Sequence, residues 1–246
     1  MMDCYICEKT ITGKYYVDGW DHKICESHLN NEAVFCSSCK GFTKKEHILP
    51  DGRILCYACM SIAIKPNDSI ELIKKSVINA LNKVGFDDLR MEDISIETTS
   101  AQKMADIRQS PVNLQNKGLT LSKTTSSISF GFFNGKGTSR KFKHTIYMLT
   151  HLTKIEFAGT LAHEMLHAWQ VQNGIQMSPK MTERLCNMGT YLMYNTLSNS
   201  LTKRLLNGLH ESTDPIYGDG FREVHAHFQE WGWSELIRNV REDKLV

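Results

Sequence analysis

Residues 161–170 read LAHEMLHAWQ, and this stretch decides how the larger part of the chain is interpreted. Its H-E-x-x-H spelling sets His163 and His167 four residues apart, about 40° around the axis of a helix, so both can hold one metal ion. Glu164 projects beside that pair, where its carboxylate can take a proton from bound water. The flanking residues are apolar or small, as a buried helix requires, and Gly174 predicts the end of the helix. A chance spelling is the alternative, but these surroundings favour a zinc active site.

A catalytic zinc needs a third protein ligand. The extended pattern H-E-x-x-H-x-x-G-x-x-H is excluded, because Gln170 and Asn173 stand where it requires glycine and the third histidine. We expect Glu183 instead, one turn into a second helix that folds back on the first. The alternative is that Glu183 is a solvent-exposed helix residue that pairs with Lys180 or Arg184, which would be the usual interpretation without the neighbouring H-E-x-x-H helix. The remaining acidic candidates are Glu211, Asp214, Asp219 and Glu223.

Stabilising an oxyanion takes a further hydrogen-bond donor from outside these two helices. We expect Tyr217, in the stretch DPIYGDGFR, or His225 to supply it, with His227 as a third candidate. Tyr217 can also be a packed tyrosine in a turn.

Two other features near the motif each allow two interpretations. The stretch HTIYMLT at 144–150 is a strand that either pairs with an extended substrate or lies in the core. Cys186 follows Glu183 by three residues on the same predicted helix, and it is either close to the metal or a small buried apolar residue.

Seven of the eight cysteines lie in the first 59 residues. In a reducing compartment such clustering favours zinc over disulfides. The spacing predicts two sites in sequence, the first formed by Cys4, Cys7, Cys25 and His28 and the second by Cys36, Cys39, Cys56 and Cys59. His22 is the alternative to His28, and a cross-braced arrangement is the alternative to sequential sites. Four protein ligands leave no open position, so both ions are expected to be structural.

The sequence predicts two domains. Each zinc loop contains an Asp-Gly turn between β-prone residues, so residues 1–65 are expected to form a tandem zinc-ribbon, LIM-like module. A helix is expected over 70–85, strands in DISIE, GLTLS, SSISFGFF and HTIYMLT with a turn in NGKGTSR, and mainly helices from 154, including at least two short ones between 222 and 243. Residues 66–246 are therefore expected to form an α+β, zincin-like domain with a small sheet and a helical C-terminal half.

Composition and charge disfavour several classes of protein. The 29 Lys and Arg residues nearly balance the 27 Asp and Glu residues, so no field that requires nucleic acid or an acidic membrane is implied. A nucleic-acid-binding zinc protein, suggested by the ribbons and the stretch SRKFKH, is therefore disfavoured. No secretory signal and no run of about 18 apolar residues occurs, so we expect no membrane partner and a cytoplasmic location.

The order of these motifs resembles a known family. Cys-x2-Cys, KICESH, a second Cys-x2-Cys and LPDGRILCYAC precede LAHEMLHAW, ERLCN and DPIYGDGFR. This order is similar to that of the plant organ-size-control peptidases, which are ubiquitin-activated LIM-domain proteins, over nearly the whole chain. The compact arrangement also resembles the short microbial members of the family.

The resemblance implies a LIM-like double-zinc module joined to a gluzincin-type zinc peptidase domain. In it His163, His167 and Glu183 would be the zinc ligands and Glu164 the catalytic base. The plant relatives carry ubiquitin-interacting motifs and a further LIM domain ahead of this region, whereas this sequence starts at the LIM-like module, so ubiquitin is left open as a partner.

We therefore expect a zinc metallopeptidase that cleaves protein substrates. Three zinc ions per chain are expected, two structural and one catalytic, and the catalytic ion would lower the pKa of its water towards about 7. The LIM-like module is expected to bind a protein partner. The alternative is a LIM-type interaction adaptor with a degenerate peptidase domain.

Native mass spectrometry of freshly purified, chelator-free protein tests this zinc count. We expect three zinc ions per chain, and two in His163→Ala, because that substitution removes a ligand of the catalytic site alone. Two ions in the wild type, with no loss in the variant, would instead favour the adaptor.

Overall fold

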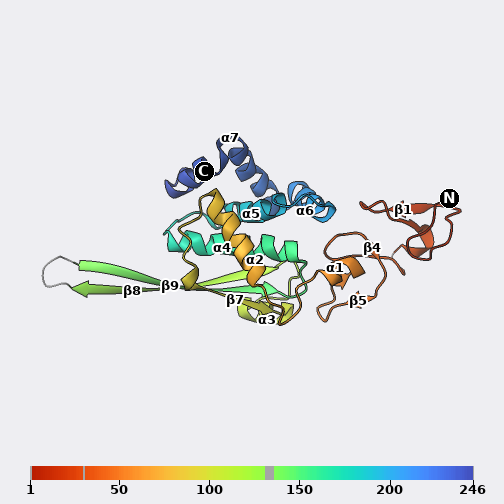
Figure 1. Cartoon of the computed structure of the whole chain (residues 1–246), viewed down its shortest axis with the longest axis horizontal. Coiled ribbons are helices and arrows are strands. Elements are labelled where there is room, and N and C mark those ends of the chain that lie inside the picture. The colour runs from red at the N-terminus through yellow and green to blue at the C-terminus, as the bar shows by residue number, and fades with distance from the viewer. Residues whose placement is uncertain (1, 30, 131–135, 246) are drawn as a thin grey trace. The chain divides into compact units, whose positions relative to one another are not determined.

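A computed structural model describes residues 2–29, 31–130 and 136–245, without the side chains of 127–130, 136–139, 216 and 217. The chain is α+β and divides into two compact units (Figure 1). The N-terminal unit comprises Met1–Asp68, Ser100–Gln115 and Thr150–Lys154, and the second unit comprises Ser69–Thr99, Asn116–Leu149 and Ile155–Val246. The boundary expected between residues 65 and 66 stays a prediction.

Short antiparallel hairpins build the N-terminal unit. The pairs are β1 Tyr15–Val17 with β2 Lys23–Cys25, β3 Val34–Phe35 with β4 Phe42–Thr43, and β5 His47–Ile48 with β6 Ile54–Leu55. The helical turns η1 Glu26–His28 and α1 Tyr57–Ser61 follow the first and third hairpins. Hairpins at both Asp-Gly turns were expected and are confirmed. In the second turn Gly52 has a φ of 86°, a conformation that glycine adopts without strain.

The apolar clusters of this unit are small. One contains Cys4, Ile6, Ile24, Ala33 and Phe42, and the other contains Cys36, Leu49, Leu55, Cys59 and Ala63. Cysteines belong to both clusters, so metal-ligand chemistry and apolar packing share the same few residues. Clusters of this size need an additional source of stability.

Asp18 joins the first hairpin to the second half of this unit. Its side chain is almost fully buried and accepts backbone N–H bonds from Trp20 at 2.7 Å, His22 at 3.0 Å and Phe42 at 2.6 Å. Burial opposes ionisation of this carboxyl, but these donors hold its pKa below the usual range. The ring N–H of Trp20 adds a second link by donating to the Cys39 carbonyl at 2.9 Å.

Two segments distant in sequence complete the N-terminal unit. Backbone N–H groups of Ile64 and His151 donate to the carbonyls of Leu152 and Ile64, and Arg53 Nη2 donates to the Thr150 carbonyl at 2.7 Å. The segment 100–115 contains helix α3 Ala101–Arg108, which the sequence did not predict.

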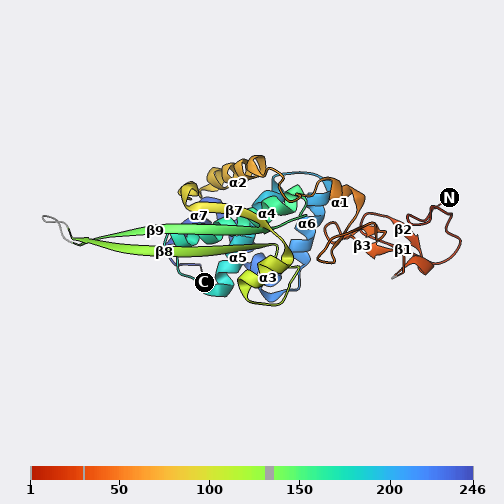
Figure 2. The ribbon, with the colours of Figure 1, turned by 90° about the horizontal axis from the view of Figure 1, so that it is seen from below.

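A three-stranded sheet forms one layer of the second unit (Figure 2). The strands are β7 Ile94–Thr99, β8 Gly118–Phe130 and β9 Lys136–Leu149, in the order β7-β9-β8. β9 pairs with β7 in parallel and with β8 in antiparallel register. The two strands expected at 118–122 and 126–133 are a single strand up to Phe130. The turn expected at 134–140 is wrong for residues 136–140, which belong to β9, and residues 134 and 135 lie outside the described ranges.

β9 is the central strand, and this corrects one expectation. From His144 to Met148 its backbone pairs with β7 on one edge and β8 on the other. The suggestion that residues 144–150 pair with an extended substrate is therefore wrong, and the strand belongs to the interior of the sheet. In the described part of the chain, β7 and β8 are the two edge strands of this sheet.

The helices of the second unit are α2 Glu71–Val84, α4 Lys154–Gln172, α5 Pro179–Asn195, α6 Ser200–Glu211 and α7 Gly220–Arg241, with short turns η2 Met91–Asp93 and η3 Pro215–Asp219. The helix expected over 70–85 is confirmed, and Gly85 ends it in the left-handed conformation. α6 was not predicted. Gly232 interrupts α7 with a non-helical backbone, which agrees with two shorter helical segments.

Figure 1 shows α4 between the sheet and α5. α5 approaches α4 closely because Gly189 has no side chain: a Cβ there would lie 2.9 Å from the backbone of Ala162. At its C-terminal end α4 is anchored by Trp169, which is fully buried, donates to Asp88 at 2.7 Å and meets the Phe86 ring edge-on. α4 is thus held firmly on both sides.

Among the described residues, no helix has the length and apolar character needed to cross a membrane.

Asp18→Asn should destabilise the N-terminal unit by about 1–3 kcal/mol at pH 7, because a buried charged acceptor is lost. The pKa of Asp18 is lower in the folded state than in the unfolded state. Its charge therefore stabilises the folded unit at pH values above the ordinary aspartate pKa. The difference between the wild type and the variant should therefore shrink as the pH falls through the lowered pKa. Denaturant titration, with release of the N-terminal zinc ions as the signal for unfolding, measures both effects.

Asp21→Asn is the matched control, because Asp21 lies in the same turn with a positive φ that asparagine tolerates. Equal losses in the two variants would contradict the linking role of Asp18.

Candidate metal centre

The H-E-x-x-H residues lie on the buried middle turns of α4. His163 and Glu164 are buried, and His167 is partly buried. Two histidines four apart share one helix face, and their Nε2 atoms are 3.1 Å from each other. The expected convergence of the two rings is present.

Glu183 of α5 faces both histidines. Its Oε2 lies 3.2 Å from His163 Nε2, and its Oε1 lies 3.5 Å from His167 Nε2. Zinc bonds of 2.0–2.1 Å in tetrahedral geometry place neighbouring ligand atoms about 3.3 Å apart. Each histidine Nε2 therefore lies at about a ligand-to-ligand distance from a different carboxylate oxygen of Glu183, so the three side chains are close enough to share one ion.

The local sequence explains why Glu183 lies here. The hydroxyl of Ser178 accepts the Met181 N–H at 3.2 Å, and Pro179 occupies the first helical position, so α5 begins one turn before Glu183. Among the other acidic candidates, Glu223 pairs with Arg184 at 2.6 Å and Asp219 pairs with a neighbouring arginine. Glu211 and Asp214 are exposed.

The electrostatics of this cluster favour positive charge. Burial opposes ionisation of Glu183, but the two histidines hold its pKa well below the usual range. Burial would also lower the pKa of His167, yet Cys186, Glu183 and Glu164 raise that pKa to about 11. Such a pocket stabilises a bound proton or a metal cation at the histidines.

Two residues of β8 hold Glu164 in place, and no sequence motif pointed to either. Thr120 Oγ1 lies 2.8 Å from Glu164 Oε2 and 3.0 Å from the Glu164 carbonyl, so its hydroxyl donates to this residue. Gly118 leaves space for the carboxylate, because a Cβ there would lie 2.6 Å from Glu164 Oε1. A strand distant in sequence therefore orients the expected base.

Asn187 orients His163 from the other side. Its Oδ1 lies 3.1 Å from His163 Nδ1 and can accept the ring N–H, which leaves Nε2 free to bind a cation. Its Nδ2 is buried without a hydrogen-bond partner among the described residues, which costs free energy of folding. The bond made by the Asn187 oxygen is therefore the reason for an amide at this position. Asn187 lies four residues after Glu183 and shares its helix face, a signal that the sequence reading missed.

The expected oxyanion donors are not brought to this cluster by any contact that the structure describes. The side chain of Tyr217 lies outside the described residues. His225 packs among aromatic rings, 4.6 Å from Tyr191 and 5.2 Å from Phe221, and His227 stacks on Trp231. Their roles stay predictions.

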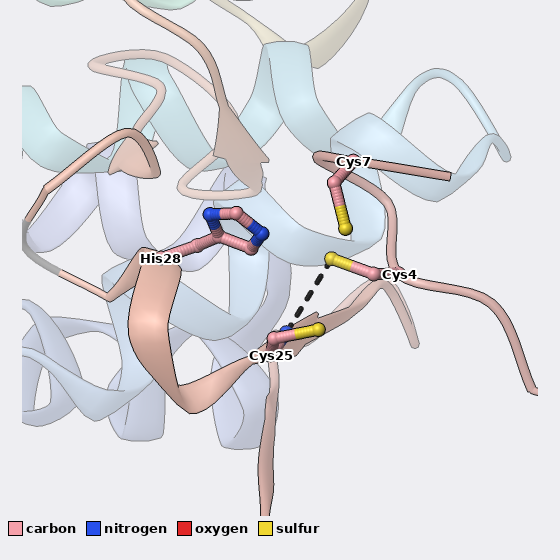
Figure 3. A group of neighbouring side chains, drawn as sticks. All are labelled: Cys4, Cys7, Cys25 and His28. Carbon is pink, nitrogen blue, oxygen red and sulfur yellow. Dashed lines mark hydrogen bonds between the residues drawn. The ribbon is translucent and has the colours of Figure 1, made fainter. Parts of the chain in front are cut away.

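The N-terminal unit holds two further clusters, and each matches one predicted sequential set. Figure 3 shows Cys4, Cys7, Cys25 and His28 converging from separate segments. Burial would raise the pKa of Cys4, but backbone N–H groups, among them that of Cys25 at 3.4 Å, lower it to about 6. This favours the thiolate that a metal ion binds.

The second cluster contains only cysteines: Cys36, Cys39, Cys56 and Cys59. The sulfurs of Cys39 and Cys56 are 3.8 Å apart. Zinc–sulfur bonds of 2.3 Å in tetrahedral geometry give about the same separation. Four soft donors at this spacing fit a structural zinc ion.

His22, the alternative ligand of the first site, lies elsewhere. Its Nδ1 is 2.9 Å from an Asp18 carboxylate oxygen, and its ring stacks on Tyr5 at 4.1 Å. The structure thus places His28, and not His22, with the three cysteines.

Comparison with curated proteins finds relatives at low identity over most of the chain. Protein DA1-related 7 of Arabidopsis thaliana is 21% identical over 294 residues, covering 97% of this chain and 52% of that protein. Protein DA1-related 2 of the same plant is 26% identical over 283 residues, covering 90% of this chain and 52% of that protein. The LIM domain-containing protein HDR3 of Oryza sativa subsp. japonica is 22% identical over 279 residues, covering 90% of this chain and 56% of that protein.

The chain thus spans about half the length of the curated relatives it matches. No protein-family model and no solved structure matches it significantly. The resemblance to the DA1-type LIM proteins, expected from the motifs, is confirmed.

Asn187→Leu should weaken zinc binding at the α4–α5 cluster by about 10–100-fold, because His163 loses the acceptor that fixes its tautomer. Chelator competition with zinc counting by native mass spectrometry measures this. Asn187→Asp, which keeps an acceptor oxygen, should retain tighter binding than the leucine variant. Equal affinity in Asn187→Leu and the wild type would contradict the role.

Proposed function

We propose that this protein is a zinc-dependent endopeptidase of gluzincin type with a zincin-like second unit. One observation carries the proposal: His163 Nε2 and His167 Nε2 lie 3.1 Å apart, each lies within 3.5 Å of a carboxylate oxygen of Glu183, and Glu164 follows His163 on the same helix. Three protein ligands leave a coordination position open, which is typical of catalytic zinc. The likeness to DA1-family proteins supports the same class.

A zinc ion held by these three side chains would supply Lewis-acid activation of water and of the scissile carbonyl. Glu164 is the residue that takes the proton of the attacking water and passes it to the leaving amine. Thr120 fixes one carboxylate oxygen of Glu164 at 2.8 Å, which leaves the other oxygen available for proton transfer. Tyr217 and His225 are kept as proposed donors to the oxyanion.

We also propose three zinc ions per chain. The two clusters of the N-terminal unit have four protein ligands each, so their ions stabilise the fold. A cytoplasmic, reducing location suits the free state of all eight cysteines. The substrate is proposed to be a protein, and the N-terminal unit is proposed to bind a protein partner, with ubiquitin as one candidate.

The second candidate function is a LIM-type adaptor without peptidase activity. The observation in its favour is that two complete four-ligand clusters and a LIM domain-containing relative account for the N-terminal unit without any chemistry. Thr120 orients Glu164 and Asn187 orients His163, and an adaptor would not need either contact. We therefore favour the peptidase.

Glu164→Gln should retain three zinc ions but lower the rate of cleavage of fluorescein-labelled casein by at least about 100-fold, because the general base is lost. Thr120→Val should lower it by about 10-fold, the effect of one hydrogen bond. Ser126→Ala, further along the same strand, is the control and should be unaffected. Cleavage by Glu164→Gln at the wild-type rate would assign the activity to a contaminant and favour the adaptor.

A further inference from the structure

Strands β8 and β9 continue past the third strand of the sheet as a two-stranded ribbon. β7 pairs with β9 only over His144–Leu149, whereas β8 pairs with β9 over Lys136–Met148. Figures 1 and 2 show the ribbon extending past the helices of the second unit. Residues 121–126 of β8 are all exposed. This part of the sheet therefore presents its side chains to solvent, and the proposed mechanism does not use it.

The ribbon is positively charged, although the charges of the whole chain nearly balance. Residues 118–149 contain no Asp or Glu, and their basic residues are Lys123, Lys136, Arg140, Lys141 and Lys143. The stretch SRKFKH at 139–144 supplies three of these. A local positive field therefore exists on this ribbon, which the net charge of +2 conceals.

The strand register places three of these lysines on one face of the ribbon. Lys123 lies directly opposite Lys143, and Thr125 lies opposite Lys141. Directly opposite residues share a face of a sheet, and so do residues two apart on one strand. Lys123, Lys141 and Lys143 are also exposed, and we call these three residues the lysine face.

The lysine face carries uncompensated charge. Like charges directly opposite each other, as on Lys123 and Lys143, destabilise a strand pair. Within the described ranges, no carboxylate forms an ion pair with any of the three lysines. A bound anionic group would offset this repulsion, so the lysine face is suited to bind negative charge.

The lysine face and the metal centre lie on opposite sides of the sheet. Thr120, whose hydroxyl contacts Glu164, precedes Lys123 by three residues and therefore points to the other face. Three residues of a strand span about 10 Å. A protein chain bound to the lysine face therefore needs at least about three extended residues to pass around the edge strand β8 and reach Glu164.

We infer that the lysine face binds an acidic segment of the protein substrate and so holds the bond to be cleaved near Glu164. This substrate preference rests on the proposed peptidase function. It names the substrate class as proteins with an acidic segment at least about three residues away from the cleaved bond. Charge complementarity between carboxylates and the three lysines provides the recognition.

Two observations favour a protein partner over nucleic acid. Three lysines on one small face, in a chain with a net charge of +2, can neutralise only a few phosphates, which gives weak binding at physiological salt. The same strand, β8, carries Lys123 and also Thr120, which holds the proposed catalytic base of a peptidase. The lysine face is thus directly connected to the proposed site of protein cleavage.

Fluorescence anisotropy of fluorescein-labelled oligoglutamate tests the binding. The protein is the full, zinc-loaded chain carrying Glu164→Gln, which prevents cleavage of the probe. Adding Lys123→Gln, Lys141→Gln and Lys143→Gln together should weaken binding by about 10-fold, because three exposed ion pairs are lost. Higher salt should also weaken it, and oligoglutamine with the same label and length should not bind.

Lys75→Gln, Lys83→Gln and Lys203→Gln together are the matched control. They remove the same charge from exposed lysines elsewhere in the second unit, so oligoglutamate affinity should stay close to that of the parent chain. Equal weakening in the two triple variants would overturn the inference. Tighter binding of oligothymidylate than of oligoglutamate, lost in the lysine-face variant, would also overturn it and identify a nucleic-acid surface.

Cleavage of fluorescein-labelled casein, itself an acidic protein, links the lysine face to the metal centre. In the chain with Glu164 intact, the lysine-face triple variant should raise KM several-fold and leave kcat unchanged, because it removes binding common to the ground and transition states. An unchanged KM would overturn the inference. A wild-type chain that cleaves no casein, while its lysine face still binds oligoglutamate, would overturn the proposed function instead, so the two failures are distinguishable.

Discussion

The close approach of α4 and α5 is the constraint on which the candidate site depends. Gly189 allows the backbones to meet at Ala162, one residue before His163, and this contact brings the first turns of α5 level with the two histidines. A side chain at Gly189 would push the helices apart, and donor atoms that must lie within about 3.3 Å of one another tolerate little displacement. Trp169 and its hydrogen bond to Asp88 hold the other end of α4, so the site is built between two fixed helices.

Around this contact, each group of the motif is oriented by a residue from another element. Thr120 of β8 holds Glu164, and Asn187 of α5 holds His163. Each orienting residue is itself fixed in a strand or helix, so the site is ordered before any ligand binds, which is what transition-state stabilisation requires. The electrostatics agree with this order. The pKa of Glu183 is lowered and that of His167 is raised, so the carboxylate stays charged and the site attracts a cation.

The N-terminal unit solves a different problem. Its apolar clusters are too small to fold a chain by burial alone, and the two four-ligand clusters close long loops around them. Asp18 accepts the backbone N–H groups of Trp20 and His22 in its own turn and that of Phe42 in the second half, so it ties the two halves together at the cost of burying a charge. Metal ligands and one buried carboxylate together replace a larger core.

The sequence by itself determined the features that depend on local geometry. Spacing on one helix predicted the convergence of His163 and His167, the Cys-x2-Cys pairs predicted two four-ligand clusters, and Asp-Gly turns predicted both hairpins. Only the tertiary structure decided that β9 is central, that 100–115 and 150–154 join the N-terminal unit, and that Thr120 and Gly118 face Glu164. Those contacts join residues dozens of positions apart, and a periodicity of two or 3.6 residues holds no information about which distant surfaces meet, because packing of the whole unit selects them.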